Sequence, residues 1–138
     1  MDATITLQDG LHFVAIPPSG FPVHIDAKPT AGGEGKGASP MELLLISLAG
    51  CTAMDVISIL RKKRQNVTGF AINIHGDRQT DHPKVFTAFT LEYVVRGVDI
   101  DPAAVARSIE LSVEAYCSVH AMLSKAATIQ TSYTIIQE

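Results

Sequence analysis

The two cysteines of the chain, Cys51 and Cys117, are the residues best suited to chemistry. Cys51 lies deep in a long apolar stretch that predicts a helix, and Cys117 lies in the helix-like segment EAYCSVHAML. Two thiols in such settings are either buried as small hydrophobic groups or brought together for redox chemistry. A disulfide requires Cα atoms about 4.4 to 6.8 Å apart, and spacing in the sequence does not establish that distance. Both interpretations therefore stay open at this stage.

The surroundings of each thiol differ in what they offer a thiolate. A cysteine in the middle of a helix, such as Cys51, gains nothing from the helix N-terminus and needs a nearby cation or hydrogen-bond donor to become reactive. Cys117 stands at the predicted start of a short helix, which is the better electrostatic setting. Asp55 follows Cys51 by four residues on the same helical face, where its carboxylate would disfavour a thiolate. Its structural alternative is a hydrogen bond at a helix crossing.

Metal and cofactor sites are not predicted. The five histidines show no zinc-like spacing and the chain has no C-x-x-C motif. Cys117 and His120 are three residues apart, but two ligands do not make a metal site. The glycine-rich segment 33–38 follows no predicted strand, so it does not match a dinucleotide-binding fingerprint, and a phosphate-binding loop fails on residue identity. We expect neither a metal nor a cofactor.

Composition limits the class of protein. The 138 residues fit one domain, residues 1–138, and 46% hydrophobic and 18% charged residues with a net charge of −3 describe a globular protein without a nucleic-acid partner. No secretory signal pattern is seen at the N-terminus, so we expect a reducing cytoplasm, where a cysteine pair is more often catalytic or redox-active than a structural disulfide. Residues 43–60 are apolar enough for a short membrane span, but Asp55 inside them favours a buried helix and no membrane.

The order of predicted elements favours an α+β fold. Strands are expected at residues 4–7, 12–16 and 22–26, with Asp9-Gly10 as a hairpin turn, and the glycine-rich loop 27–38 follows. Ser39 and Glu42 form an S-x-x-E capping box that starts a helix running to about Lys63. Two long strands (67–78 and 84–96), a helix from Asp101-Pro102, a short helix after Cys117 and a strand at 131–136 complete the chain. In the second long strand, the set containing Phe89, Leu91 and Tyr93 is expected to face the core. We predict antiparallel sheets packed around a long, buried central helix.

The two cysteine segments also resemble a known family. The run SPMELLLISLAGCTAMDVISILRKKR and the segment VEAYCSVHAML are similar to the osmotically inducible protein C and organic hydroperoxide resistance family (OsmC/Ohr). The resemblance covers nearly the whole chain. It implies an intertwined homodimer with active sites at the subunit interface. It also implies reduction of organic hydroperoxides, with Cys51 as the peroxidatic thiolate, Cys117 as the resolving thiol and a dithiol reductant such as a dihydrolipoyl group.

Two positions depart from the peroxidases of that family. Those peroxidases use an Arg from the N-terminal strands to stabilise the thiolate, whereas this chain has no Arg before Arg61. Lys28, Lys36 or an Arg of the partner chain would then have to take the place of that Arg. The peroxidases also carry a catalytic Glu directly after the Pro, where this chain has Met41, so Glu42 is only a secondary catalytic candidate. The leading hypothesis is a cytoplasmic, homodimeric thiol peroxidase active in oxidative stress. The alternatives are an OsmC-like protein that binds a small ligand or senses redox state at the same cleft, and a scaffold with two structural cysteines.

Overall fold

The computed structural model describes residues 1–138, and the chain divides into two compact units, Met1–Leu44 and Leu45–Glu138. The first unit holds a three-stranded antiparallel sheet of β1 (Thr4–Asp9), β2 (His12–Ile16) and β3 (Val23–Ile25) in sequence order. Gly10 adopts a positive φ of 50° in the β1–β2 turn, which confirms the predicted hairpin. The second unit holds the rest of the sheet structure and both cysteines.

The glycine-rich loop after β3 is ordered around Asp26. The Asp26 side chain is buried and its carboxylate accepts backbone N–H bonds from Ala27, Glu34 and Lys36. These bonds hold the pKa of Asp26 below its usual value. A short 3₁₀ turn, η1 (Pro29–Ala31), lies within the loop. A Cβ at Gly37 would collide with the backbone carbonyl of His24, so the loop needs glycine at that position.

The long helix α1 (Pro40–Lys62) starts at the predicted capping box. The Ser39 N–H donates to Glu42 Oε2 at 2.6 Å, and the Glu42 N–H donates to Ser39 Oγ at 3.3 Å. Two backbone donors of the first turn are satisfied in this way. Arg61 and Lys62 in the last turn complement the negative end of the helix dipole.

Burial of α1 is confined to one stripe within the chain. Leu48, Thr52, Val56 and Leu60 recur every four residues and are its only buried side chains. Ile46 is 57% exposed and Met54 69% exposed, so a single chain buries the predicted central helix along one side only. By length and hydropathy alone α1 matches a membrane span, a test that the core helix of a soluble protein also passes. Its buried stripe packs in the hydrophobic core of the second unit.

The sheet of the second unit has the order β4-β5-β6. The strand β4 (Asn66–Arg78) pairs antiparallel with β5 (Phe86–Val98), and β6 (Thr128–Gln137) pairs parallel with β5. The prediction of antiparallel sheets is therefore wrong for β6. After β5 the chain crosses over through α2 (Pro102–Leu111), the π-helical turn η2 (Ser112–Tyr116) and α3 (Ser118–Leu123). Such a helical crossover returns the chain to the starting end of the sheet, so that the next strand runs parallel.

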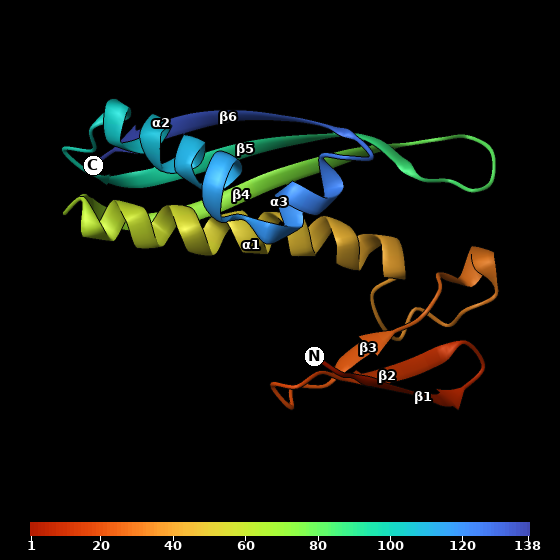
Figure 1. Cartoon of the computed structure of the whole chain (residues 1–138). Coiled ribbons are helices and arrows are strands. Elements are labelled where there is room, and N and C mark those ends of the chain that lie inside the picture. Colours follow the sequence, from red (N-terminus) through yellow and green to blue (C-terminus); the bar gives the residue numbers. More distant parts are fainter. The chain divides into compact units, whose positions relative to one another are not determined.

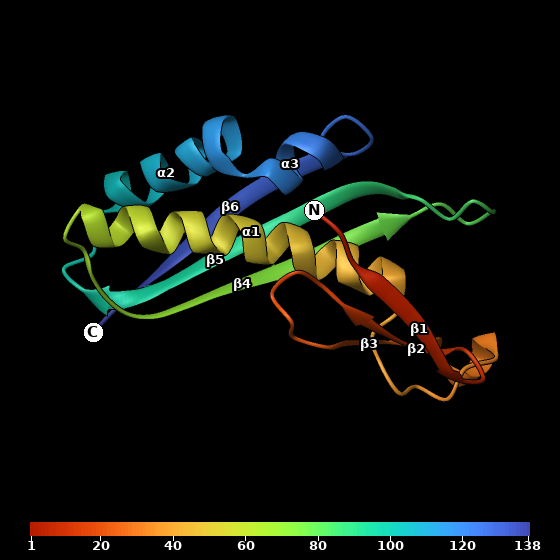
Figure 2. The same cartoon turned by 60° about the horizontal axis from the view of Figure 1, so that its bottom comes forward.

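The helices α1 and α2 lie side by side on one face of this sheet (Figures 1 and 2). The alternate residues Phe89, Leu91, Tyr93 and Val95 of β5 are buried against them, as predicted for the first three. On the other face, Glu92 accepts hydrogen bonds from Asn73 and Thr134. One face of β5 is thus core and the other polar, which is the pattern expected of a sheet covered on one side.

Candidate functional site

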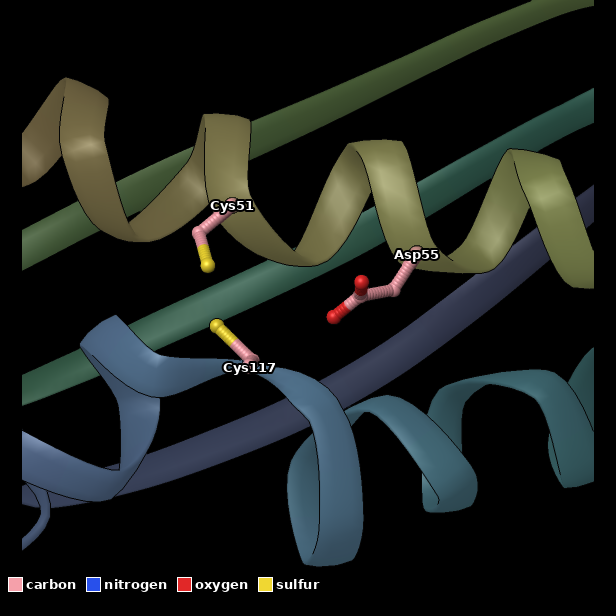
Figure 3. A group of neighbouring side chains, drawn as sticks. All are labelled: Cys51, Asp55 and Cys117. Atoms are coloured by element: carbon pink, nitrogen blue, oxygen red, sulfur yellow. The ribbon is translucent and has the colours of Figure 1, made fainter.

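The two thiols and one carboxylate meet between α1 and the start of α3. Cys51 and Asp55 lie one helical turn apart on α1, and Cys117 comes from the junction of η2 and α3. The Sγ atoms of Cys51 and Cys117 and a carboxylate oxygen of Asp55 all lie within 4.8 Å of one another. Figure 3 shows the two sulfur atoms facing each other, with the Asp55 carboxylate beside them. Both cysteines are free thiols; Cys117 is buried and Cys51 is half-buried.

The π-helical turn positions Cys117. The Cys117 N–H donates to the Ser112 carbonyl at 2.8 Å, which closes a turn one residue wider than an α-helical turn. The Cys117 backbone then becomes extended (φ −76°, ψ 100°), and its Sγ accepts the N–H of His120 at 3.3 Å as the N-cap of α3. Helices with such a π-turn often carry functional residues. The predicted break at Cys117-Ser118 is confirmed.

A chain of buried hydroxyl groups ends at Asp55. The Ser112 Oγ donates to Asp55 Oδ2 at 2.9 Å. Because a hydroxyl has one proton, the 2.8 Å bond between Ser112 and Thr52 must be donated by Thr52. By the same reasoning, the 2.8 Å bond between Thr52 and Tyr93 is donated by the Tyr93 hydroxyl. Every hydroxyl proton in this series of hydrogen bonds points toward the Asp55 carboxylate, so the series fixes the position of that side chain.

The electrostatic setting of Cys117 disfavours its thiolate. The pKa of Cys117 is raised to about 11, mainly by burial of the thiol. The hydrogen bond and charge interaction with Cys51 and the charge of Asp55 raise this pKa further, while the hydrogen bond from the His120 N–H lowers it by a smaller amount. Burial also raises the pKa of Tyr93 and lowers the pKa of His120. Cys117 is therefore a protonated thiol at neutral pH. The side-chain charges that act on it, Cys51 and Asp55, are both acidic.

The structure brings together only some of the residues singled out in the sequence. Cys51 and Cys117 are adjacent. Asp55 accepts a hydrogen bond from Ser112 of η2, which corresponds to its structural alternative. Glu42 is used in the capping box, where hydrogen bonds from Ser39 lower the pKa of its carboxyl group. Lys36 forms ion pairs with Asp9 and Glu34 at 2.9 and 2.6 Å.

Sequence reasoning missed Thr52, Tyr93 and Ser112. The one signal for them was a polar Thr52 in the buried stripe of an otherwise apolar helix, since a buried hydroxyl must find a partner. The grouping of Cys51, Asp55 and Cys117 as possible metal ligands was also missed, because Cys117 was considered only with His120 and not with Asp55. A hollow of about 500 Å³ lies elsewhere in the second unit, lined by residues such as Ile109, Val113 and Tyr133, and includes neither cysteine.

Comparison with known proteins identifies relatives along the whole chain. The family described as OsmC-like protein matches residues 33–132. The protein YhfA of Escherichia coli strain K12 is 40% identical over 137 residues, covering 99% of this chain and 98% of YhfA.

Two solved structures extend this similarity. A crystal structure of a protein from Aquifex aeolicus is 32% identical with a TM-score of 0.87, covering 99% of this chain and 96% of that one. A Legionella pneumophila organic hydroperoxide resistance protein OsmC has a TM-score of 0.71 at 12% identity, covering 96% and 95% of the two chains. At that identity the last comparison shows a shared fold alone.

Proposed function

The chain belongs to the OsmC-like protein family, and on that basis we propose that it is a thiol-dependent peroxidase that reduces organic hydroperoxides through Cys51 and Cys117. The observation that carries the proposal is the meeting of two free thiols, far apart in sequence, within 4.8 Å of each other. The Legionella protein of the same fold is named an organic hydroperoxide resistance protein, and that name supports the proposed substrate class.

The roles of the two cysteines follow from their burial and charge state. Cys51 is the more accessible of the two and is assigned as the peroxidatic residue. Its thiolate attacks the hydroperoxide O–O bond, so that Cys51 becomes a sulfenic acid and the substrate leaves as an alcohol after taking up one proton. Cys117, a protonated thiol at neutral pH, is poorly suited to this attack and is assigned as the resolving residue.

Resolution and reduction complete the cycle. The Cys117 sulfur displaces the hydroxyl of the Cys51 sulfenic acid, which forms a disulfide and releases water, the Cys117 proton leaving with the hydroxyl. An external dithiol, such as a dihydrolipoyl group, then reduces the disulfide and is itself oxidised to a cyclic disulfide. The physiological setting proposed for this cycle is the cytoplasm, under oxidative stress.

Activation of Cys51 requires a cation that the second unit does not supply next to the thiols. The charges acting on Cys117 are acidic, and Lys36 already pairs with two carboxylates. We therefore assign the activating cation to the partner chain of a homodimer, with Lys28 of the same chain as the alternative. Ile46 and Met54, exposed on α1, provide the apolar surface that a partner would cover.

Cumene hydroperoxide turnover with a dithiol tests the assignment. Cys51→Ser should abolish turnover, whereas Cys117→Ser should accumulate a sulfenic acid at Cys51 that a dimedone-type reagent traps. Ser58→Ala, an exposed change on the same helix, should keep wild-type turnover. Wild-type turnover no faster than the dithiol background would refute the peroxidase function.

Glu42 is a secondary catalytic candidate. Glu42→Gln keeps a residue able to form the capping box and removes only the charge. If the carboxylate acts on the peroxide, turnover should fall while the thermal midpoint stays near the wild-type value. Equal turnover in Glu42→Gln and wild type would leave Glu42 with the capping role alone.

The acidic surroundings of the thiols favour one alternative function. A protein that binds a small electrophile or senses redox state at the same cysteines needs no fast thiolate. Such a protein would form the Cys51–Cys117 disulfide stoichiometrically with an oxidant such as diamide but would show no catalytic turnover of cumene hydroperoxide.

A further inference from the structure

Asp55 is not explained by the peroxidase cycle. A peroxidatic thiolate is favoured by a neighbouring cation, yet the neighbour here is a carboxylate. The Asp55 carboxylate is held in place by the Ser112 hydroxyl at 2.9 Å, and Ser112 in turn is held by the buried Thr52. The fold thus fixes a carboxylate beside two thiols.

Two thiols and a carboxylate are the donor set of a thiophilic divalent cation. Zn²⁺ takes Cys sulfur at about 2.3 Å and carboxylate oxygen at about 2.0 to 2.2 Å, usually in tetrahedral geometry. In a tetrahedron, those bond lengths place the two sulfur atoms and the oxygen about 3.5 to 3.8 Å apart. The three donors lie within 4.8 Å of one another, so modest side-chain rotations suffice to converge on one ion.

The outer contacts of the cluster match those of metal ligands. Ligating carboxylates are generally hydrogen-bonded by a second residue that sets their orientation. Ser112 supplies that bond to Asp55, and the His120 N–H supplies a bond at 3.3 Å to Cys117 Sγ. Both bonds come from the crossover segment that also carries Cys117, so one segment orients two of the three donors.

We propose that reduced Cys51, Asp55 and Cys117 bind one Zn²⁺ ion per chain, with a fourth position left to water. The ion replaces the two thiol protons, which pass to the buffer, and no group changes oxidation state. Zinc binding and disulfide formation require the same two sulfur atoms and exclude each other. The ion therefore holds the two thiols in the reduced state. This site does not depend on peroxidase activity, because binding is measured without any peroxide.

Zn²⁺ titration of the reduced, untagged protein against a colorimetric zinc chelator tests the site. One equivalent should bind, and Cys51→Ser or Cys117→Ser should each abolish that binding. Asp55→Asn, which keeps an oxygen that can accept from Ser112, should lower the Zn²⁺ affinity at least about tenfold. Removing a residue that only hydrogen-bonds a metal ligand already lowers the affinity by about that factor. The diamide-oxidised protein should not bind.

Two controls separate this site from other donors. Asp81→Asn removes an exposed carboxylate, and His24→Ala removes one ring of the exposed His12–His24 pair, whose ring nitrogens lie 2.9 Å apart. Both variants should bind as wild type does. Loss of binding in His24→Ala, or unchanged binding in Asp55→Asn that retains the wild-type circular dichroism spectrum, would overturn the proposal.

Co²⁺ provides a readout that needs no variant. Wild-type reduced protein loaded with Co²⁺ should show the sulfur-to-cobalt charge-transfer band and the intense visible bands of tetrahedral coordination. A spectrum that shows the weak visible bands of octahedral Co²⁺ and no charge-transfer band would also overturn the proposal.

Discussion

Thr52 lies in the middle of the buried hydroxyl chain, where its oxygen accepts from Tyr93 and donates to Ser112. Thr52 is 1% exposed, and its two hydrogen-bond partners, Tyr93 and Ser112, are fully buried. A buried hydroxyl that loses its only partner incurs the full desolvation penalty. The site therefore depends on a residue that forms no hydrogen bond with either sulfur atom.

Thr52→Val should lower the free energy of unfolding by about 1–3 kcal/mol, because the Tyr93 hydroxyl is left without an acceptor. Tyr93→Phe should have a smaller effect, since Thr52 still donates to Ser112. Chemical denaturation of both variants measures the difference. Thr68→Val, which removes an exposed hydrogen bond to Glu138, is the matched control and should change stability little. A Thr52→Val variant as stable as Thr68→Val would show that the buried hydrogen bonds of Thr52 do not contribute to stability.

The Cys117 thiol should make stability depend on alkaline pH. Its folded pKa is raised to about 11, whereas an unfolded thiol ionises near about 8.5. The unfolded state therefore loses its proton first, so the contribution of Cys117 to stability is full below about pH 8.5 and is lost as pH rises to about 11. The stability of the reduced wild type relative to Cys117→Ser should fall between pH 7.5 and pH 10 with a chelator present. A difference that rises with pH would have the wrong sign.

At the scale of the elements, α1 links the capping box to the thiol site. The box satisfies backbone donors at Ser39 and Glu42, and the same helix presents Cys51 and Asp55 one turn apart. Nucleation of a helix is unfavourable on its own, so a defined first turn helps to set where the helix begins.

Ser39→Ala should therefore destabilise the protein by about 0.5–2 kcal/mol, the usual loss for an N-cap serine. The substitution removes the Oγ that accepts the Glu42 N–H at 3.3 Å. Thermal and urea unfolding provide the measurement. Ser58→Ala, exposed within the same helix, is the control and should be neutral or slightly stabilising because alanine has the higher helix propensity. Equal stability of the two variants would show that the cap contributes nothing.

Local signals explain which elements could be predicted. The Ser39-x-x-Glu42 box, the Asp9-Gly10 turn and the alternation through Phe89, Leu91 and Tyr93 depend on neighbours along the chain, and all three were predicted. The parallel pairing of β6 was not predicted, because the path of the crossover depends on packing rather than on residues in β6. The meeting of Cys117 with Asp55 was missed for the same reason, since a π-helical turn between Ser112 and Cys117 has no sequence signature that was recognised.

At the scale of the whole molecule, α1 leaves an apolar stripe on its outer side. Ile46 and Met54 are separated by two turns and are 57% and 69% exposed, and Gly50 between them has open space where a Cβ would be. Residues at this spacing lie on one face of a helix. An apolar stripe of this kind is typical of a surface covered by another protein chain.

We therefore expect the protein to be a dimer in solution, with the Ile46–Met54 stripe in the interface. Sedimentation equilibrium should give twice the chain mass for the wild type and one chain mass for the double variant Ile46→Glu and Met54→Glu, because a buried, unpaired charge is strongly unfavourable at an interface. Gln130→Glu, a near-isosteric charge on exposed β6, should remain dimeric. If the double variant folds and stays dimeric, the interface lies elsewhere, and the cation assigned to the partner must reach Cys51 from a different surface.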